Sequence, residues 1–170
     1  MIPFSEALNI VKHNTIKPGY ENVPLSAASG RYLAETIYAD RDTPPFNKSA
    51  VDGFACRGED LGEKLEIVET IPAGYEPSVK VEKGKCSRIM TGAMLPEGAD
   101  TVVMVEDCVV EDNYMHFRGG KGRDNICMRG EDMSSGSIAI PSGTLINAAH
   151  IAILASMGIS SPLVCKKFKI

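Results

Sequence analysis

The sequence has no apolar run approaching the roughly 20 residues that a membrane-spanning helix needs. Its first residues lack a basic segment followed by a long apolar stretch, so no signal peptide or transit sequence is visible. Lysine and arginine form no cluster and the net charge is −4, which argues against nucleic acid, because phosphates are bound by a concentrated basic surface. We therefore expect a soluble, cytoplasmic protein that binds neither membranes nor nucleic acid.

The common signatures of catalytic and metal sites are missing too. The five cysteines are an odd number at irregular spacings, which fits neither a disulfide framework nor a zinc site and predicts reduced thiols. The histidines, His13, His116 and His150, share no ligand spacing. The sequence has no GxxxxGK[ST] loop, no GxGxxG motif and no GxSxG elbow. Lys121 and Arg123 could contact a phosphate or simply form a solvated turn.

The chain does contain helical patterns near its N-terminus. Ser5 can cap a helix over Glu6–Lys12, because a serine side chain accepts a hydrogen bond from a free amide of the first turn. A second helix is predicted near Ser26–Ala34, although Gly30 interrupts it. These two segments indicate that the chain begins with helical structure.

A further helix is predicted over Ala148–Met157, with Asn147 as its N-cap and Gly158 in the left-handed position that ends it. This segment is apolar nearly all round, so it should be buried on several sides. Packing inside the domain and packing against a second subunit both satisfy that requirement, and the sequence does not choose between them.

Between the helical ends the chain reads as short strands. Thr43-Pro44-Pro45-Phe46 cannot be helical, because proline lacks a backbone donor and forces the preceding residue into an extended conformation. Beyond it, short apolar runs alternate with Gly, Pro and Asp, which is typical of a β-rich segment. The clearest strands are Leu65–Ile71, Val79–Val81, Arg88–Met90, Thr101–Glu106 and a hairpin of Cys108–Val110 with Tyr114–Phe117 around Glu111-Asp112-Asn113.

This arrangement predicts an α+β fold. Residues 1–42 and 134–170 would form a discontinuous first domain, and residues 43–133 would form a β-rich domain inserted into it.

Three loops carry residues that could act on a ligand. Asp52 could hold Mg²⁺ or orient a water, or it could form an Asx-turn with nearby amides. Thr91 could approach a phosphate, or it could simply end a strand. Glu131 and Asp132 could supply a metal ligand or general base and Arg129 could pair with an anion, although a surface charge cluster is the usual meaning of such a run.

The amino-acid sequences of these loops, and their order along the chain, resemble those of one protein family. PPFNKSAVDGFACR (44–57), RIMTGAMLPEGADTVVMVE (88–106) and NICMRGEDMSSGSIAIPSGTLINAAHIAILASMGI (125–159) are similar to consecutive segments of the molybdopterin molybdenumtransferases, the bacterial MoeA proteins and the E domain of gephyrin. The chain departs from the family at several positions, among them Asn47, where an aspartate is frequent. Three long matches in the right order are far more specific than a single motif.

The resemblance implies a fold and an activity. The fold would be an elongated α+β first domain with an inserted β-rich domain. The activity would be Mg²⁺-dependent insertion of molybdate into adenylylated molybdopterin, with release of AMP, in molybdenum cofactor biosynthesis. By position in the family motifs, Asp52 and Asp132 are expected to be catalytic and Thr91 to bind substrate, whereas the metal ligands are not identified.

The resemblance also implies partners. The family enzyme is expected to be a homodimer, with a molybdopterin adenylyltransferase as a further partner. Because the family continues into an α/β domain that carries most of the pterin contacts, this chain alone is expected to be inactive. The alternative is a non-catalytic dimerisation or scaffolding module of the gephyrin type.

Overall fold

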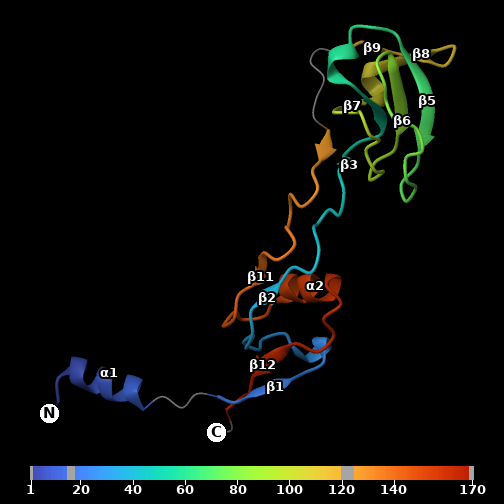
Figure 1. The fold of residues 1–170 in the computed structure, drawn as a ribbon. Helices are drawn as coiled ribbons and strands as arrows, with labels where there is room; N and C mark the ends of the chain where they lie inside the picture. The colour runs from blue at the N-terminus through green and yellow to red at the C-terminus, as the bar shows by residue number, and fades with distance from the viewer. Residues whose placement is uncertain (1, 15–17, 120–124, 169–170) are drawn as a thin grey trace. The chain divides into compact units, whose positions relative to one another are not determined.

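The computed structural model describes residues 2–14, 18–119 and 125–168 (Figure 1). The stretch predicted to form a turn at Lys121 and Arg123 lies outside the described residues. Contacts between backbone positions divide the chain into two compact units. The first unit comprises residues 1–40 and 137–170, and the second comprises residues 41–136.

The first unit is built on two small antiparallel ladders. Strand β1 (Tyr20–Asn22) pairs with β12 (Leu163–Cys165), and β2 (Ile37–Tyr38) pairs with β11 (Ile138–Ile140). Each ladder joins a segment from the start of the chain to one from its end, so the two halves of this unit depend on each other. The core comprises Val23, Ala28, Leu33, Ile37, Ile140, Ile146, Leu154 and Val164.

The helix near the C-terminus is confirmed. Helix α2 (Ala148–Ser156) begins after Asn147, whose side chain accepts a hydrogen bond from the His150 amide at 3.1 Å, and Gly158 has the expected positive φ of 72°. Leu154 is its one buried residue. The core of this unit therefore accounts for only part of the apolar surface of α2.

Helix α1 (Phe4–His13) is observed, but Ser5 does not cap it. Pro3 occupies the N-cap and makes no side-chain cap bond, so Ser5 falls inside the first turn. Proline is compatible with this N-cap, because the φ of −60° observed there is the value that its ring imposes. None of the residues of α1 is buried.

The predicted helix over Ser26–Ala34 is wrong. Only a single 3₁₀ turn forms there, η1 (Leu25–Ala27). The amides of Gly30, Leu33 and Ala34 donate to the carbonyls of Ile146, Thr144 and Leu163, so tertiary contacts take donors that a helix would use.

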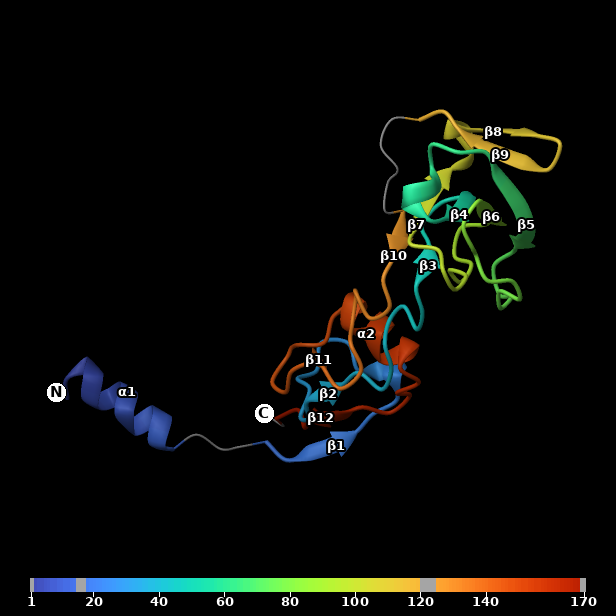
Figure 2. The same cartoon turned by 45° about the horizontal axis from the view of Figure 1, so that its top comes forward.

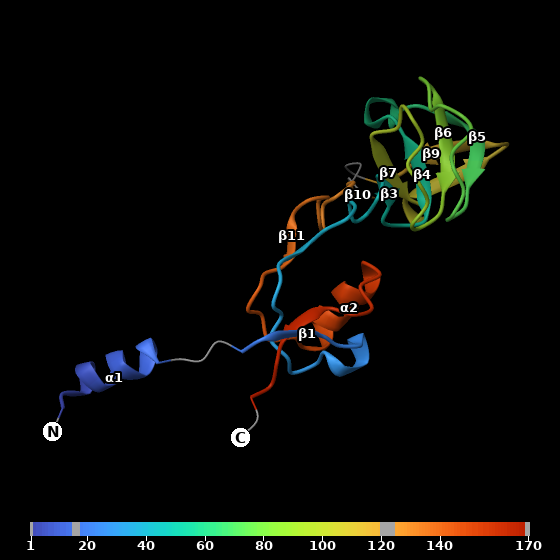
Figure 3. The same ribbon diagram turned by 60° about the horizontal axis from the view of Figure 1, so that its bottom comes forward.

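The second unit contains a six-stranded mixed sheet in the order β7-β4-β6-β5-β9-β8 (Figures 1 and 3). Strands β5 and β6 run parallel, and the other neighbours in this sheet run antiparallel. The strands are β4 (Gly53–Cys56), β5 (Leu65–Ile71), β6 (Lys85–Ile89), β7 (Thr101–Met104), β8 (Cys108–Glu111) and β9 (Tyr114–Phe117). Two further 3₁₀ turns, η2 (Gly58–Asp60) and η3 (Val105–Asp107), follow β4 and β7.

Several strand predictions for this sheet are confirmed. Strand β5 has the predicted bounds, and β8 and β9 form the predicted hairpin (Figure 2). Asp112 and Asn113 both have positive φ, as a two-residue hairpin loop requires. The predicted strand Val79–Val81 is wrong, because the Val81 amide bonds to the Glu97 carbonyl within a loop.

A short ladder completes the second unit. Strand β3 (Lys48–Ser49) pairs antiparallel with β10 (Ile126–Cys127), and an isolated bridge joins Thr43 to Met133. The two segments that enter and leave the unit are therefore held side by side by backbone hydrogen bonds.

Two apolar clusters fill the second unit. One contains Phe54, Cys56, Leu65, Cys86, Val103 and Met115, and the other contains Ala55, Ile71, Ile89, Ala93 and Val102. Cys56 and Cys86 lie opposite each other on β4 and β6 as free thiols, and burial raises the pKa of each to about 12. These thiols pack as small apolar side chains. Among the described residues, no helix is long and apolar enough to cross a bilayer.

Ser87 offers a stability prediction in this core. It is fully buried opposite Ala55, and its hydroxyl has no hydrogen-bond partner among the described residues. Because an unsatisfied buried hydroxyl is costly, Ser87→Ala should raise the free energy of unfolding by about 1 kcal/mol, measured by urea denaturation. The buried Ser49 hydroxyl, which donates to the Val51 carbonyl at 2.6 Å, supplies the control, and Ser49→Ala should be destabilising. A loss of stability in Ser87→Ala would contradict the prediction.

Candidate functional site

Asp52 and Thr91, which are 39 residues apart in sequence, meet at the ends of β4 and β6. Oδ1 of Asp52 accepts hydrogen bonds from the Thr91 amide at 2.7 Å and from the Thr91 hydroxyl at 2.6 Å. Both residues are exposed. The structure thus brings together two of the three residues that the sequence singled out.

The loop that carries Asp52 is held on both sides. The Ser49 hydroxyl donates to the Val51 carbonyl, and the Val105 amide donates to the Asp52 carbonyl at 3.0 Å. A Cβ at Gly53 would lie 1.8 Å from the Val103 carbonyl oxygen. Only glycine therefore allows β4 to lie this close to β7 immediately after the aspartate.

The loop that carries Thr91 is fixed by the same part of the chain. The Gly92 amide donates to the Ser49 carbonyl at 2.8 Å, and the Ser49 amide donates to the Ala93 carbonyl at 3.0 Å. Gly92 has a φ of 81°, a conformation that favours glycine. Ser49 thus links the two loops, a role that sequence reasoning missed because the bonds use its backbone.

The Asp52 carboxylate is held in its ionised form. The Thr91 hydroxyl and then the Thr91 amide lower the pKa of Asp52 below its ordinary value of 3.8 against the opposing effect of burial, and the positive charge of Arg88 lowers it further. A depressed pKa means that Asp52 stabilises the fold above about pH 3.8, a contribution that is lost as the pH falls through the folded pKa. At neutral pH the site presents a negative charge.

This arrangement predicts the titration of Asp52. Thr91→Val removes the hydroxyl donor but keeps the amide, so the pKa of Asp52 should rise towards 3.8. The pKa of Asp52 is measured from its carboxyl ¹³C chemical shift as a function of pH. Thr144→Val, which removes a hydroxyl that donates to Pro141 in the other unit, should leave the pKa of Asp52 unchanged. An unchanged pKa in Thr91→Val would show that the hydroxyl does not stabilise the carboxylate.

The third candidate, Asp132, lies in the segment after β10. Its amide donates to the Thr43 carbonyl at 3.0 Å, and its side chain is exposed. Among the described residues, no hydrogen bond joins Asp132 to Asp52 or Thr91. The structure therefore does not bring Asp132 into the hydrogen-bonded pair.

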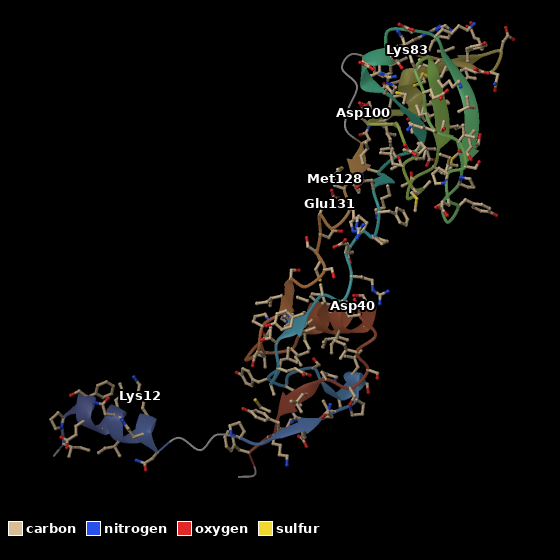
Figure 4. All side chains as sticks on the ribbon, in the orientation of Figure 1. Lys12, Asp40, Lys83, Asp100, Met128 and Glu131 are labelled. Carbon is tan, nitrogen blue, oxygen red and sulfur yellow. The ribbon has the colours of Figure 1, made fainter. Side chains whose placement is uncertain are left out.

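The neighbours of Asp132 are engaged in local contacts. Oε2 of Glu131 accepts a hydrogen bond from the Met128 amide at 2.7 Å. Figure 4 labels both residues, which lie close together. Nε of Arg129 donates to Asp42 at 2.5 Å, and the Arg129 amide donates to Oδ1 of Asn47. The Arg129 guanidinium is thus paired with a carboxylate of its own unit.

The described residues contain no group of three or more His, Cys, Asp or Glu side chains that could hold a metal ion. Asp52 does offer one carboxylate oxygen, Oδ2, that is free of hydrogen bonds within the described part of the chain. Mg²⁺ commonly binds one or two carboxylates and completes its shell with water and substrate phosphates. Asp52 therefore fits a magnesium ion whose other ligands are water and substrate. The described residues do not fit a site in which the protein supplies all the ligands.

A family model described as the MoeA N-terminal region, domains I and II, matches residues 2–158. The chain belongs to the MoeA family. A relative from Staphylococcus epidermidis named molybdopterin molybdenumtransferase is 36% identical over 174 residues, covering 98% of this chain and 42% of the relative. One of the same name from Bacillus subtilis is 38% identical over 178 residues, covering 98% and 41%.

A solved MoeA structure agrees with this assignment. A molybdopterin biosynthesis MoeA protein from Pyrococcus horikoshii superimposes with a TM-score of 0.87 at 34% identity, covering 98% of this chain and 46% of that one. The α+β fold of the MoeA N-terminal region is thereby confirmed. The chain spans about two fifths of the length of the curated MoeA relatives described above.

Proposed function

We propose that this chain acts as the N-terminal part of a molybdopterin molybdenumtransferase, which inserts molybdate into adenylylated molybdopterin with release of AMP in molybdenum cofactor biosynthesis. The proposal rests mainly on the Asp52–Thr91 pair, an ionised carboxylate and a hydroxyl on exposed loops, within two segments that resemble MoeA motifs. The names of the relatives support the same reaction.

Each residue of the pair has a role that its geometry supports. Asp52 is the acidic positioning group, because its carboxylate stays charged and keeps Oδ2 available. Thr91 contacts the substrate and holds Asp52 in orientation through its amide and hydroxyl. Mg²⁺ bound at Asp52 would supply positive charge against phosphate oxygens. Asp132 is proposed as a second acidic group on its place in the family motif, and it would act through substrate rather than through Asp52.

We propose further that the two units act as the two domains of this region and that the protein is a cytoplasmic homodimer. The exposed alanines of α2 support dimer packing, while its isoleucines pack partly against the core of its own unit. A molybdopterin adenylyltransferase is the partner that would supply the adenylylated substrate.

The proposal predicts that the 170-residue chain alone is inactive, because the relatives are more than twice its length. The intact mass of the native polypeptide, detected with an antibody to this chain, tests that premise. A mass at least twice 18.3 kDa supports the proposal. A native mass of 18.3 kDa, or robust molybdate insertion by the isolated chain, contradicts it, and the small mass would favour an interaction module of the gephyrin type.

A further inference from the structure

Arg88 lies beside the Asp52–Thr91 pair on β6. It is opposite Phe54 in the antiparallel pairing of β6 with β4, and it precedes by three residues Thr91, which lies in the turn after β6. Asp52 lies two residues before Phe54, which makes it a diagonal neighbour of Arg88. Such neighbours are about 7–8 Å apart, a distance that a long side chain can span. The charge of Arg88 indeed lowers the pKa of Asp52.

The guanidinium of Arg88 differs in its partners from four other cations of the second unit, each of which forms an ion pair. Arg57 pairs with Glu59, Lys80 with Glu97, Lys85 with Glu82 and Arg129 with Asp42. Within the described part of the chain, no carboxylate lies within ion-pair distance of Arg88, and the residue is exposed. Its five N–H donors are therefore available to a ligand.

We propose that Arg88 is a substrate-binding residue of this site and contacts a tetrahedral oxyanion. The inference rests on the proposed function, which supplies two such groups: a phosphate of adenylylated molybdopterin and molybdate. Guanidinium suits either one, because its planar donors match two oxygens at once. Arg88 would also add positive charge beside the Asp52 carboxylate, which by itself would repel a neighbouring anion.

The first test is kinetic and uses the full-length protein. Arg88→Gln should raise the KM for molybdate or for adenylylated molybdopterin at least tenfold while changing kcat less, and Arg88→Lys should restore part of the affinity. A rise in the KM for molybdate alone identifies molybdate as the bound oxyanion. A rise in the KM for the adenylylated substrate alone identifies its phosphate. Arg118→Gln removes another exposed arginine of the second unit and should leave both KM values unchanged.

The second test does not depend on turnover. The ¹⁵N-labelled chain is titrated with AMP and, separately, with molybdate, and the amides of Thr91 and Gly92 are followed by NMR. Binding to one of these probes should be at least tenfold weaker in Arg88→Gln than in the wild type and in Arg118→Gln. Unchanged KM values together with equal binding by wild type and Arg88→Gln would overturn the proposal. If the wild-type protein shows no transferase activity but Arg88→Gln still loses binding, the proposed function is refuted and the anion site at Arg88 is supported.

Discussion

Asp52→Asn in the full-length protein is expected to reduce molybdate insertion about a hundredfold or more, a loss comparable to removing a key electrostatic group from an active site. The amide oxygen of asparagine can still accept from Thr91, so the substitution removes the charge and keeps the geometry. The loss should appear mainly in kcat, because the proposed task of the carboxylate is electrostatic. Steady-state assays of AMP release measure it.

Asp100→Asn is the matched control for this experiment. Oδ1 of Asp100 accepts from the Gly58 amide at 2.7 Å and from the Thr101 hydroxyl at 2.9 Å, the same kinds of donor that Asp52 has. Its substitution should leave molybdate insertion within about twofold of wild type. Equal losses in the two variants would mean that Asp52 is needed only for folding.

Gly53→Ala is expected to destabilise the protein by about 3 kcal/mol or more, because the added methyl group cannot be accommodated without moving backbone. The new Cβ would lie 1.8 Å from the carbonyl oxygen of Val103 and 2.9 Å from its carbonyl carbon. Strands β4 and β7 would have to separate there, which also displaces Asp52. Urea denaturation measures the stability, and the rise in the pKa of Asp52 reports the displacement.

Gly62→Ala provides the comparison. Nothing lies within 4 Å of a Cβ built at Gly62, so alanine should change the free energy of unfolding by no more than about 0.5 kcal/mol. A Gly53→Ala protein as stable as Gly62→Ala would show that β4 and β7 do not approach as closely as described.

Local patterns predicted those elements whose partners are close in sequence. Helix α2 follows from Asn147 and Gly158, and the β8–β9 hairpin from Asp112 and Asn113, because caps and tight turns depend on the residues that form them. Residues 26–34 were mispredicted as a helix because the amides of Gly30, Leu33 and Ala34 bond to distant carbonyls that the sequence does not reveal.

For the same reason, the sequence predicted individual residues of the candidate site but not the contacts between them. Asp52 and Thr91 stand in recognisable motifs, but their shared hydrogen bonds depend on the register of β4 against β6. Arg88 begins one of the MoeA-like segments, but no role was predicted for it, because an arginine on a strand is ordinary until its unpaired position beside Asp52 is known. The need for glycine at position 53 likewise comes from Val103, which is 50 residues away in sequence.

The most direct test of the central claim is AMP release by the purified full-length protein from adenylylated molybdopterin, measured with and without molybdate. The account predicts release that requires molybdate, that is abolished or severely reduced by Asp52→Asn, and that the isolated 170-residue chain does not perform. Release at the same rate without molybdate, or no release from the full-length protein at all, would contradict it.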